Sequence, residues 1–243
     1  MRAVLVYKWA RNVADAMVRS DGSIDWRNAK MTAGEDDPAA LAAATRIAGD
    51  SAGEVVGLTI GDGDASWALA RGVERAYSVS DAPNLTDNAA TAKILAAAIR
   101  QLGVVDVVVI GDSRQDPGVA VALAGELGWP AMVGLESASV EGGRLLVTRK
   151  SAGRQQIVTL PTPAVIGIAA ESDLDRVPGM KELLAARKRP LTPLTLAELG
   201  VAPQDLVTRG CQRPASTPTR VFEGDPAEAV AQLVAALRNE GVL

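Results

Sequence analysis

Hydrophobic residues in the first half of the chain form short continuous runs. Runs of about four to eight apolar residues are typical of parallel strands that other elements cover on both faces. They predict strands over residues 3–7, 54–61, 75–79 and 104–111. Between these runs, apolar residues recur at helical spacing and predict helices over residues 37–48, 64–71, 88–102 and 119–127. The alternation favours an α/β fold of Rossmann-like type, with a mainly parallel sheet and helices on both of its faces.

The pattern changes after about Pro130. Glycine-containing turns at residues 142–143 and 151–153 separate short apolar segments, which predict strands over 137–140, 144–148, 155–160 and 164–169. Closely spaced strands with glycine turns indicate an antiparallel extension at the edge of the sheet. Residues 171–219 are rich in proline and charge and predict an arm or loop. A last amphipathic helix is predicted over 226–240, with Asp225 as its N-cap.

The length and composition of the chain are those of one large domain with extensions. Its 243 residues are 48% hydrophobic, enough to bury a core that is mainly aliphatic because aromatic residues make up only 3%. We expect an α/β domain over residues 1–190, with antiparallel strands and a surface loop at about 171–190. A C-terminal arm with a helix is expected over residues 191–243.

Charge and the rarest residue types exclude several functions. Histidine is absent, which removes the usual general base and the commonest zinc ligand. Cys211 is the only thiol, so we expect no disulfide and no cysteine cluster for a metal, and a reducing cytoplasm is the expected location. The net charge of −4 without a long basic block makes nucleic acid a poor partner. No apolar stretch of about 18 residues occurs, so we expect no membrane span.

Ligands of open parallel sheets bind outside the carboxyl ends of the strands. The end of the strand over 104–111 is the most informative, because Ser113 and Arg114 precede the free N–H groups of the next helix and would suit a phosphate. In this interpretation Asp116 caps that helix and Pro117 is its first residue. An ordinary strand-to-helix turn explains the same residues. Neither a Walker loop nor a complete G-x-G-x-x-G motif is present.

Two charged clusters have both a functional and a structural interpretation. The carboxylates at residues 35–37 could bind a metal or act as acid and base, but acidic residues also interact favourably with the N-terminal end of a helix dipole. The segment 180–189 combines apolar residues with a basic end. It could dock an acidic partner, or it could be a solvated helix end.

Several segments, in a shared order and spacing, resemble the electron-transfer flavoprotein β subunit across nearly the whole chain. They cover residues 4–8 (VLVYK), 19–26 (RSDGSIDW), 68–76 (ALARGVERA), 125–130 (GELGWP), 160–165 (LPTPAV) and 176–190 (RVPGMKELLAARKRP). The resemblance implies a heterodimer whose α subunit carries most contacts to a redox-active FAD. The β subunit closes over that flavin and binds AMP, or a second FAD in members that bifurcate electrons.

The resemblance also assigns residues by position. It places the nucleotide against Val6, Gly34, Glu35, Asp36, Asp37, Ile60, Gly111, Ser113, Arg114, Gln115, Asp116, Gly118 and Val119. It places Asn12 and Val13 near the flavin, and it implies that partner dehydrogenases are recognised by Met180, Leu183, Leu184, Arg187 and Lys188. The arm over 191–243 would pack on the α subunit.

The chain departs from the family pattern at the nucleotide site. Gly34-Glu35-Asp36-Asp37 stands where members usually carry Asn-Pro-x-Asp, and the loop over 113–118 is shortened. Arg114 would then place a direct charge on a phosphate.

The expected function is a carrier that relays electrons from dehydrogenases to an acceptor oxidoreductase, with no catalytic residue and no metal site in this chain. The alternative is a stand-alone protein of the same fold that binds or hydrolyses adenine nucleotides.

Overall fold

A computed structural model describes residues 1–61, 64–83, 87–112, 116, 118–169, 177–202, 206–207, 209–210, 212, 214–216 and 219–243. The chain divides into two compact units. The large unit comprises residues 1–17 and 25–209, and the small unit comprises residues 18–24 and 210–243.

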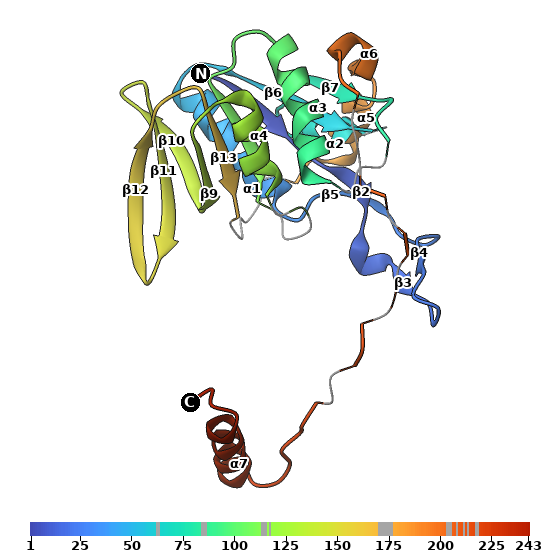
Figure 1. Ribbon diagram of the computed structural model, residues 1–243. Helices are drawn as coiled ribbons and strands as arrows, with labels where there is room; N and C mark the ends of the chain where they lie inside the picture. Colours follow the sequence, from blue (N-terminus) through green and yellow to red (C-terminus); the bar gives the residue numbers. More distant parts are fainter. Residues whose placement is uncertain are drawn as a thin grey trace. The chain divides into compact units, whose positions relative to one another are not determined.

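The large unit is built around a seven-stranded sheet in the order β14-β7-β6-β1-β8-β13-β9 (Figure 1). Every pairing within it is parallel. The strands are β1 (Arg2–Val6), β6 (Glu54–Ile60), β7 (Arg75–Val79), β8 (Val107–Gly111), β9 (Ala131–Leu135), β13 (Ala164–Ile168) and β14 (Leu191–Leu194). The four strands predicted in the first half of the chain are confirmed, as is the mainly parallel α/β class.

Helices cover both faces of this sheet, and each face has its own hydrophobic core. Helices α1 (Asp37–Asp50) and α2 (Ser66–Leu69) pack on one face, whereas α3 (Asn88–Gln101), α4 (Val119–Leu127) and α6 (Leu196–Leu199) pack on the other. The buried faces of α1 and α3 are rich in alanine. Short side chains let these helices approach the sheet closely, so a chain with few aromatic residues still builds a dense core.

The antiparallel strands form a sheet of their own. Strands β10 (Ser137–Glu141), β11 (Arg144–Ser151) and β12 (Arg154–Leu160) pair in that order, and α1 contacts β10. The prediction that 164–169 is antiparallel was wrong, because β13 lies parallel between β8 and β9. All five of its residues are buried, as expected for an interior parallel strand. The nearby glycine turns concealed that signal.

The segment that follows residue 190 contributes to the large unit before the chain leaves it. Leu191–Leu194 adds the edge strand β14 beside β7, and α6 packs against α3. The intervening helix α5 (Met180–Ala186) contacts α2.

The connection between β1 and α1 leaves the sheet as a separate excursion. Strands β2 (Trp9–Arg11) and β5 (Met31–Ala33) pair in antiparallel orientation, and a short 3-10 helix, η1 (Val13–Asp15), follows β2. Strands β3 (Met17–Val18) and β4 (Ile24–Asp25) form a two-stranded sheet.

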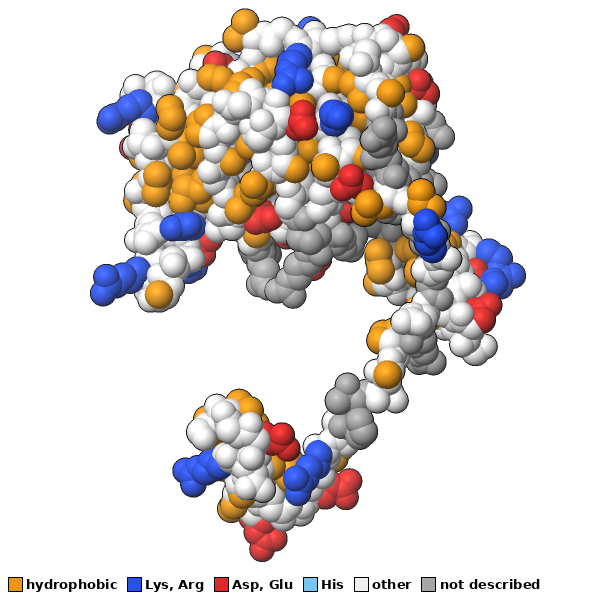
Figure 2. Space-filling view, viewed as in Figure 1, with side chains coloured by type: hydrophobic (Ala, Val, Ile, Leu, Met, Phe, Trp, Pro, Cys, Tyr) orange, Lys and Arg blue, Asp and Glu red, His pale blue; other side chains and the backbone are white. Residues whose placement is uncertain are grey.

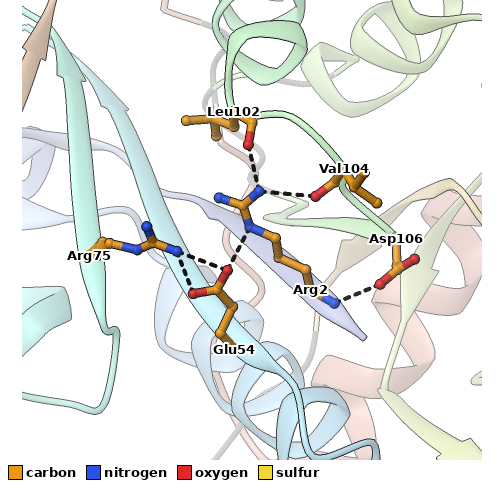
Figure 3. Close-up of polar contacts among 6 residues, drawn as sticks. All are labelled: Arg2, Glu54, Arg75, Leu102, Val104 and Asp106. Atoms are coloured by element: carbon orange, nitrogen blue, oxygen red, sulfur yellow. Dashed lines mark hydrogen bonds and ion pairs between the residues drawn. The ribbon is translucent and has the colours of Figure 1, made fainter.

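Polar contacts join the amino ends of the central strands (Figure 3). They lie at the end of the sheet opposite to the carboxyl ends of the same strands. Glu54 on β6 forms ion pairs with Arg2 Nε at 2.8 Å and with Arg75 Nη2 at 2.7 Å. Arg2 Nη1 also donates to the carbonyl oxygens of Leu102 and Val104, in the connection that leads to β8. One arginine thus links β1 to its neighbour β6 and to the segment that precedes its other neighbour.

The small unit contains α7 (Pro226–Asn239), which confirms the predicted last helix. Asp225 is its N-cap, as predicted, and accepts a hydrogen bond from Ala227 N at 2.9 Å. None of its residues is buried. Within the described part of the chain, no helix is long and apolar enough to cross a membrane.

Candidate functional site

A cavity of about 250 Å³ lies at the carboxyl ends of β1, β6 and β8. This is the switch point of the strand order: β6 and β7 follow on one side of β1, and β8 is added on the other side. Such switch points are the usual ligand sites of parallel sheets. The cavity is lined by Val6, Tyr7, Lys8, Trp9, Ala10, Gly34, Asp37, Thr59, Ile60, Gly61, Ala82, Pro83, Thr91, Leu95, Ile110, Gly111, Asp116 and Val119. We call it the strand-end cavity.

Asp37 is a buried carboxylate in the wall of the strand-end cavity. Its Oδ2 atom accepts hydrogen bonds from the backbone N–H groups of Lys8 at 2.8 Å and Gly34 at 2.7 Å. Burial raises the pKa of Asp37 to about 6, although the two hydrogen bonds and the charge of Lys8 oppose the rise. The sequence left open a metal or acid–base role for this carboxylate. In the structure it holds the turn before α1 against the end of β1.

Two glycines allow this close packing around Asp37. A Cβ atom on Gly34 would lie 2.8 Å from Asp37 Oδ2. A Cβ atom on Gly111 would lie 3.0 Å from the backbone of Asp36 and Asp37. A side chain at position 34 would therefore displace the Asp37 carboxylate, and one at position 111 would press on the backbone of this turn, whichever ligand the strand-end cavity takes.

The start of α4 brings a second charged pair into the strand-end cavity. Asp116 Oδ2 lies 2.5 Å from Lys8 Nζ, and both side chains are about half exposed. The predicted capping was wrong, because Gly118, with φ 95°, is the N-cap residue and α4 begins at Val119. Instead of capping the helix, the Asp116 side chain forms the ion pair with Lys8. Ser113, Arg114, Gln115 and Pro117 lie outside the described residues.

Thr59 and Tyr7 are polar residues of the wall that sequence reasoning missed. Each is buried, and neither hydroxyl has a hydrogen-bond partner among the described atoms. Burial, with the nearby carboxylates of Asp64 and Asp37, raises the pKa of the Tyr7 phenol, so it stays protonated. Thr59 could have been suspected, since it is the one hydroxyl in the apolar run of β6. A buried hydroxyl without a partner is costly in apolar surroundings.

A second pocket, of about 550 Å³, adjoins the first and shares Lys8, Ala10 and Gly34 with it. We call it the excursion pocket, because β2, η1 and β5 supply most of its wall: Ala10, Arg11, Asn12, Val13, Ala14, Thr32 and Ala33, with Lys8, Gly34 and Glu35. Asn12 caps η1, with its Oδ1 atom accepting from Ala14 N at 3.0 Å. Val13 is half exposed.

The predicted nucleotide residues thus separate into groups. Those in the wall of the strand-end cavity are Val6, Gly34, Asp37, Ile60, Gly111, Asp116 and Val119. Glu35 lines the excursion pocket, together with Asn12 and Val13. Asp36 and Gly118 line neither pocket, although each is adjacent in sequence to a residue in the wall.

The predicted recognition residues lie on and just after α5, away from both pockets. Met180 is 72% exposed and Leu184 is 50% exposed, whereas Leu183 is half-buried. Arg187 and Lys188 are exposed beyond the helix. Arg189 has a structural role that the sequence did not reveal: its guanidinium donates to the carbonyl oxygens of Leu69, at 3.2 Å, and Glu74. It fastens the end of α5 beside α2.

The residues present fit an adenine nucleotide better than a metal. Apolar side chains in the strand-end cavity would cover a planar base, and the Thr59 hydroxyl needs a polar partner. Lys8 and the N-terminal end of α4 offer positive charge to a phosphate. Among the described residues, no group of three acidic, histidine or cysteine side chains could hold a metal ion.

Similarity to known proteins identifies the family of this chain. The family model of the electron transfer flavoprotein domain matches residues 27–199. The chain is 32% identical over 238 residues to a protein of Bradyrhizobium diazoefficiens (strain JCM 10833 / BCRC 13528 / IAM 13628 / NBRC 14792 / USDA 110) described as electron transfer flavoprotein subunit beta, and 93% of each chain is covered. A parallel α/β fold with a cavity at the switch point of its sheet is the class that the structure defines. Within that class, the chain belongs to the electron transfer flavoprotein β subunit family.

Proposed function

We propose that this chain is the β subunit of a heterodimeric electron-transfer flavoprotein. In that role it helps to enclose an FAD held mainly by an α subunit, and the pair relays electrons from dehydrogenases to an acceptor oxidoreductase. The bound flavin supplies the redox chemistry, so this chain needs no catalytic residue of its own. Its family and the excursion pocket beside η1 support the proposal.

The excursion between β1 and α1 is the proposed flavin-facing surface. In the large unit it exposes the apolar side chains Val13, Met17 and Met31. A cluster of exposed apolar residues often marks an interaction site, whereas single exposed apolar residues are common on any protein surface. Val13 and Asn12 would contribute an apolar contact and an amide to the flavin environment. Neither group exchanges protons near neutral pH.

The strand-end cavity is the proposed site of a structural adenine nucleotide, either AMP or the adenine portion of a second FAD. The observation that carries this assignment is the convergence of apolar walls, the Thr59 hydroxyl and Lys8 at the switch point of the sheet. In this role the nucleotide would fill space between β1, α3 and α4 and stabilise the fold by binding only the folded chain. Arg114 would place a direct charge on its phosphate.

The exposed side of α5 is the proposed recognition site for partner dehydrogenases. Met180 would act as the apolar anchor, with Leu184 beside it and with Arg187 and Lys188 as flanking charges. Methionine and arginine are enriched in protein–protein interfaces relative to the rest of the protein surface. The segment over 191–243 would complete the complex by packing its terminal helix on the α subunit.

Co-purification of the chain with its partner, followed by mass spectrometry of the small molecules released on denaturation, tests these assignments. We expect a yellow complex of two different chains that releases FAD and, in addition, AMP or a second FAD. A colourless homodimer that hydrolyses ATP would instead support the stand-alone nucleotide-binding protein, for which the same strand-end cavity is the site.

A further inference from the structure

The ion pair between Lys8 and Asp116 joins two segments that are far apart in sequence and meet at the strand-end cavity. Lys8 follows β1 by two residues, and Asp116 precedes the N-cap of α4 by two. The Nζ–Oδ2 distance is 2.5 Å, and the side chains are 45% and 40% exposed. Both residues line the strand-end cavity. In this structure, the carboxylate of Asp116 therefore neutralises the ammonium group that faces the cavity.

Two features near this pair favour a bound anion, although the carboxylate of Asp37 also lies close to Lys8. The backbone N–H of Lys8 donates to Asp37, which fixes the main chain there and leaves the ammonium at the end of a flexible stem. Gly118 at the N-cap of α4 has no side chain that could cap the helix. Of the first-turn N–H groups, that of Val119 donates to the carbonyl oxygen of Asp116 at 3.4 Å. Independently, the Thr59 hydroxyl is 1% exposed and has no partner among the atoms described. That hydroxyl requires a polar ligand atom or water.

We propose that Lys8 is the phosphate-binding cation of the strand-end cavity and that Asp116 competes with the ligand's phosphate for it. The inference rests on the proposed nucleotide function of the cavity. A carboxylate and a phosphate both accept charge-assisted hydrogen bonds from an ammonium group. A nucleoside monophosphate that reaches Lys8 must displace Asp116 or share the lysine with it. Asp116 thus lowers the preference of the site for a nucleotide over the corresponding nucleoside.

The test compares AMP with adenosine, which differ only in the phosphate. The full-length chain and its variants Lys8→Met and Asp116→Asn are titrated with each ligand by isothermal calorimetry at low salt. Because half-exposed ion pairs contribute little, Asp116→Asn should raise the preference for AMP by about two- to fivefold. Lys8→Met should lower it by about tenfold or more, since a charged hydrogen bond is lost. Adenosine affinity should stay within about twofold in both variants, which also shows that they fold.

Glu136→Gln is the matched control. Glu136 pairs with Lys150 at 2.7 Å, so the substitution also breaks a carboxylate–lysine pair and removes one negative charge, but neither residue lines the strand-end cavity. It should leave the preference for AMP unchanged. This comparison separates competition at Lys8 from the general effect of a less acidic chain.

The outcomes separate this inference from the proposed function. If the wild type binds AMP and both variants keep its preference, the competition is refuted while the nucleotide function stands. If only Asp116→Asn binds AMP, the competition is supported and a structural nucleotide in the wild type is refuted. If no form binds AMP or adenosine, both proposals fail.

Discussion

At the scale of single residues, Asp37 has the clearest link between structure and pH. Its side chain is 4% exposed, and ionisation there costs more than in water, which raises the pKa from 3.8 to about 6. A carboxyl group with a raised pKa stabilises the folded state most below pH 3.8, where it is neutral in both states. That contribution is lost as the pH rises toward and past 6. Since one pKa unit corresponds to about 1.4 kcal/mol, the full loss is about 3 kcal/mol.

The substitution Asp37→Asn removes the charge and keeps an oxygen that can accept from Lys8 N and Gly34 N. We expect the unfolding free energy of this variant, minus that of the wild type, to increase by about 2 kcal/mol between pH 4 and pH 7. Urea unfolding at four pH values in this range measures the difference, and the subtraction cancels the contributions of other carboxylates. Glu35→Gln, which removes an exposed carboxyl from the same turn, is the control. If the unfolding free energies of the wild type and Asp37→Asn change with pH in parallel, ionisation of Asp37 does not destabilise the folded state.

The site was predictable from the sequence only in part. Strand ends can be located from apolar runs, so Ile60 and Gly111 were correctly placed at the carboxyl ends of strands. The turn before the first helix was brought to the same site only by the family resemblance. The pairing of Lys8 with Asp116 depends on strand order, which no local pattern contains. Whether Asp37 is buried depends on the glycines at 34 and 111 and on the segments that they admit. Burial of that kind is a property of the assembled fold.

At the scale of elements, α5 illustrates how the fold presents a surface residue. Ala186 is buried and Leu183 is half-buried, while Met180 at the start of the helix is exposed. Arg189 fixes the end of the segment through two carbonyl oxygens, at Leu69 and Glu74. A short helix with one seated face and one anchored end can present Met180 rigidly. Rigid presentation reduces the entropy that is lost when a partner binds.

We expect Met180→Ala to slow the reduction of the flavoprotein complex by its partner dehydrogenase by about five- to thirtyfold, as loss of an apolar interface anchor commonly does. Stopped-flow absorbance of the flavin measures the rate. The flavin content and the melting temperature should not change, because Met180 is 72% exposed in this chain. Val121→Ala is the matched control, since Val121 is a 54% exposed apolar residue on α4. Equal rates for Met180→Ala and Val121→Ala would remove α5 from the recognition site.

Elements themselves were predicted well where their apolar pattern is continuous. The bounds of β7 and α4 agree with the prediction to the residue. The errors have physical causes. The strand predicted over 104–111 was too long at its start. Val104 is 79% exposed in the segment after α3, and β8 begins at Val107. The strand at 191–194 contains Pro193, which favoured an arm, but an edge strand tolerates proline.

At the scale of the whole molecule, the two units differ in how much they bury. The large unit has a hydrophobic core on each face of its sheet, whereas α7 in the small unit has no buried residue. Val230, Leu233, Val234 and Leu237 recur at helical spacing on α7, and Figure 2 shows hydrophobic side chains on this helix between charged ones. An isolated helix of 14 residues is marginal in water. The apolar side of α7 is therefore expected to gain its stability from a partner surface.

Deletion of residues 210–243 should separate folding from assembly. Because both cores lie in the large unit, we expect the truncated chain to unfold cooperatively, with a melting temperature within about 3 °C of the wild type when each is purified alone. We expect it to lose the partner subunit in a tagged co-purification. Leu233→Asp refines the test, since it places a charge on the apolar side of α7, and Gln232→Asp adds the same charge at a neighbouring exposed position. Only Leu233→Asp should weaken the complex, by about tenfold or more, because a buried unpaired charge is costly. If the truncated chain still co-purifies with its partner in normal amounts, the terminal helix is not the surface that holds the two chains together.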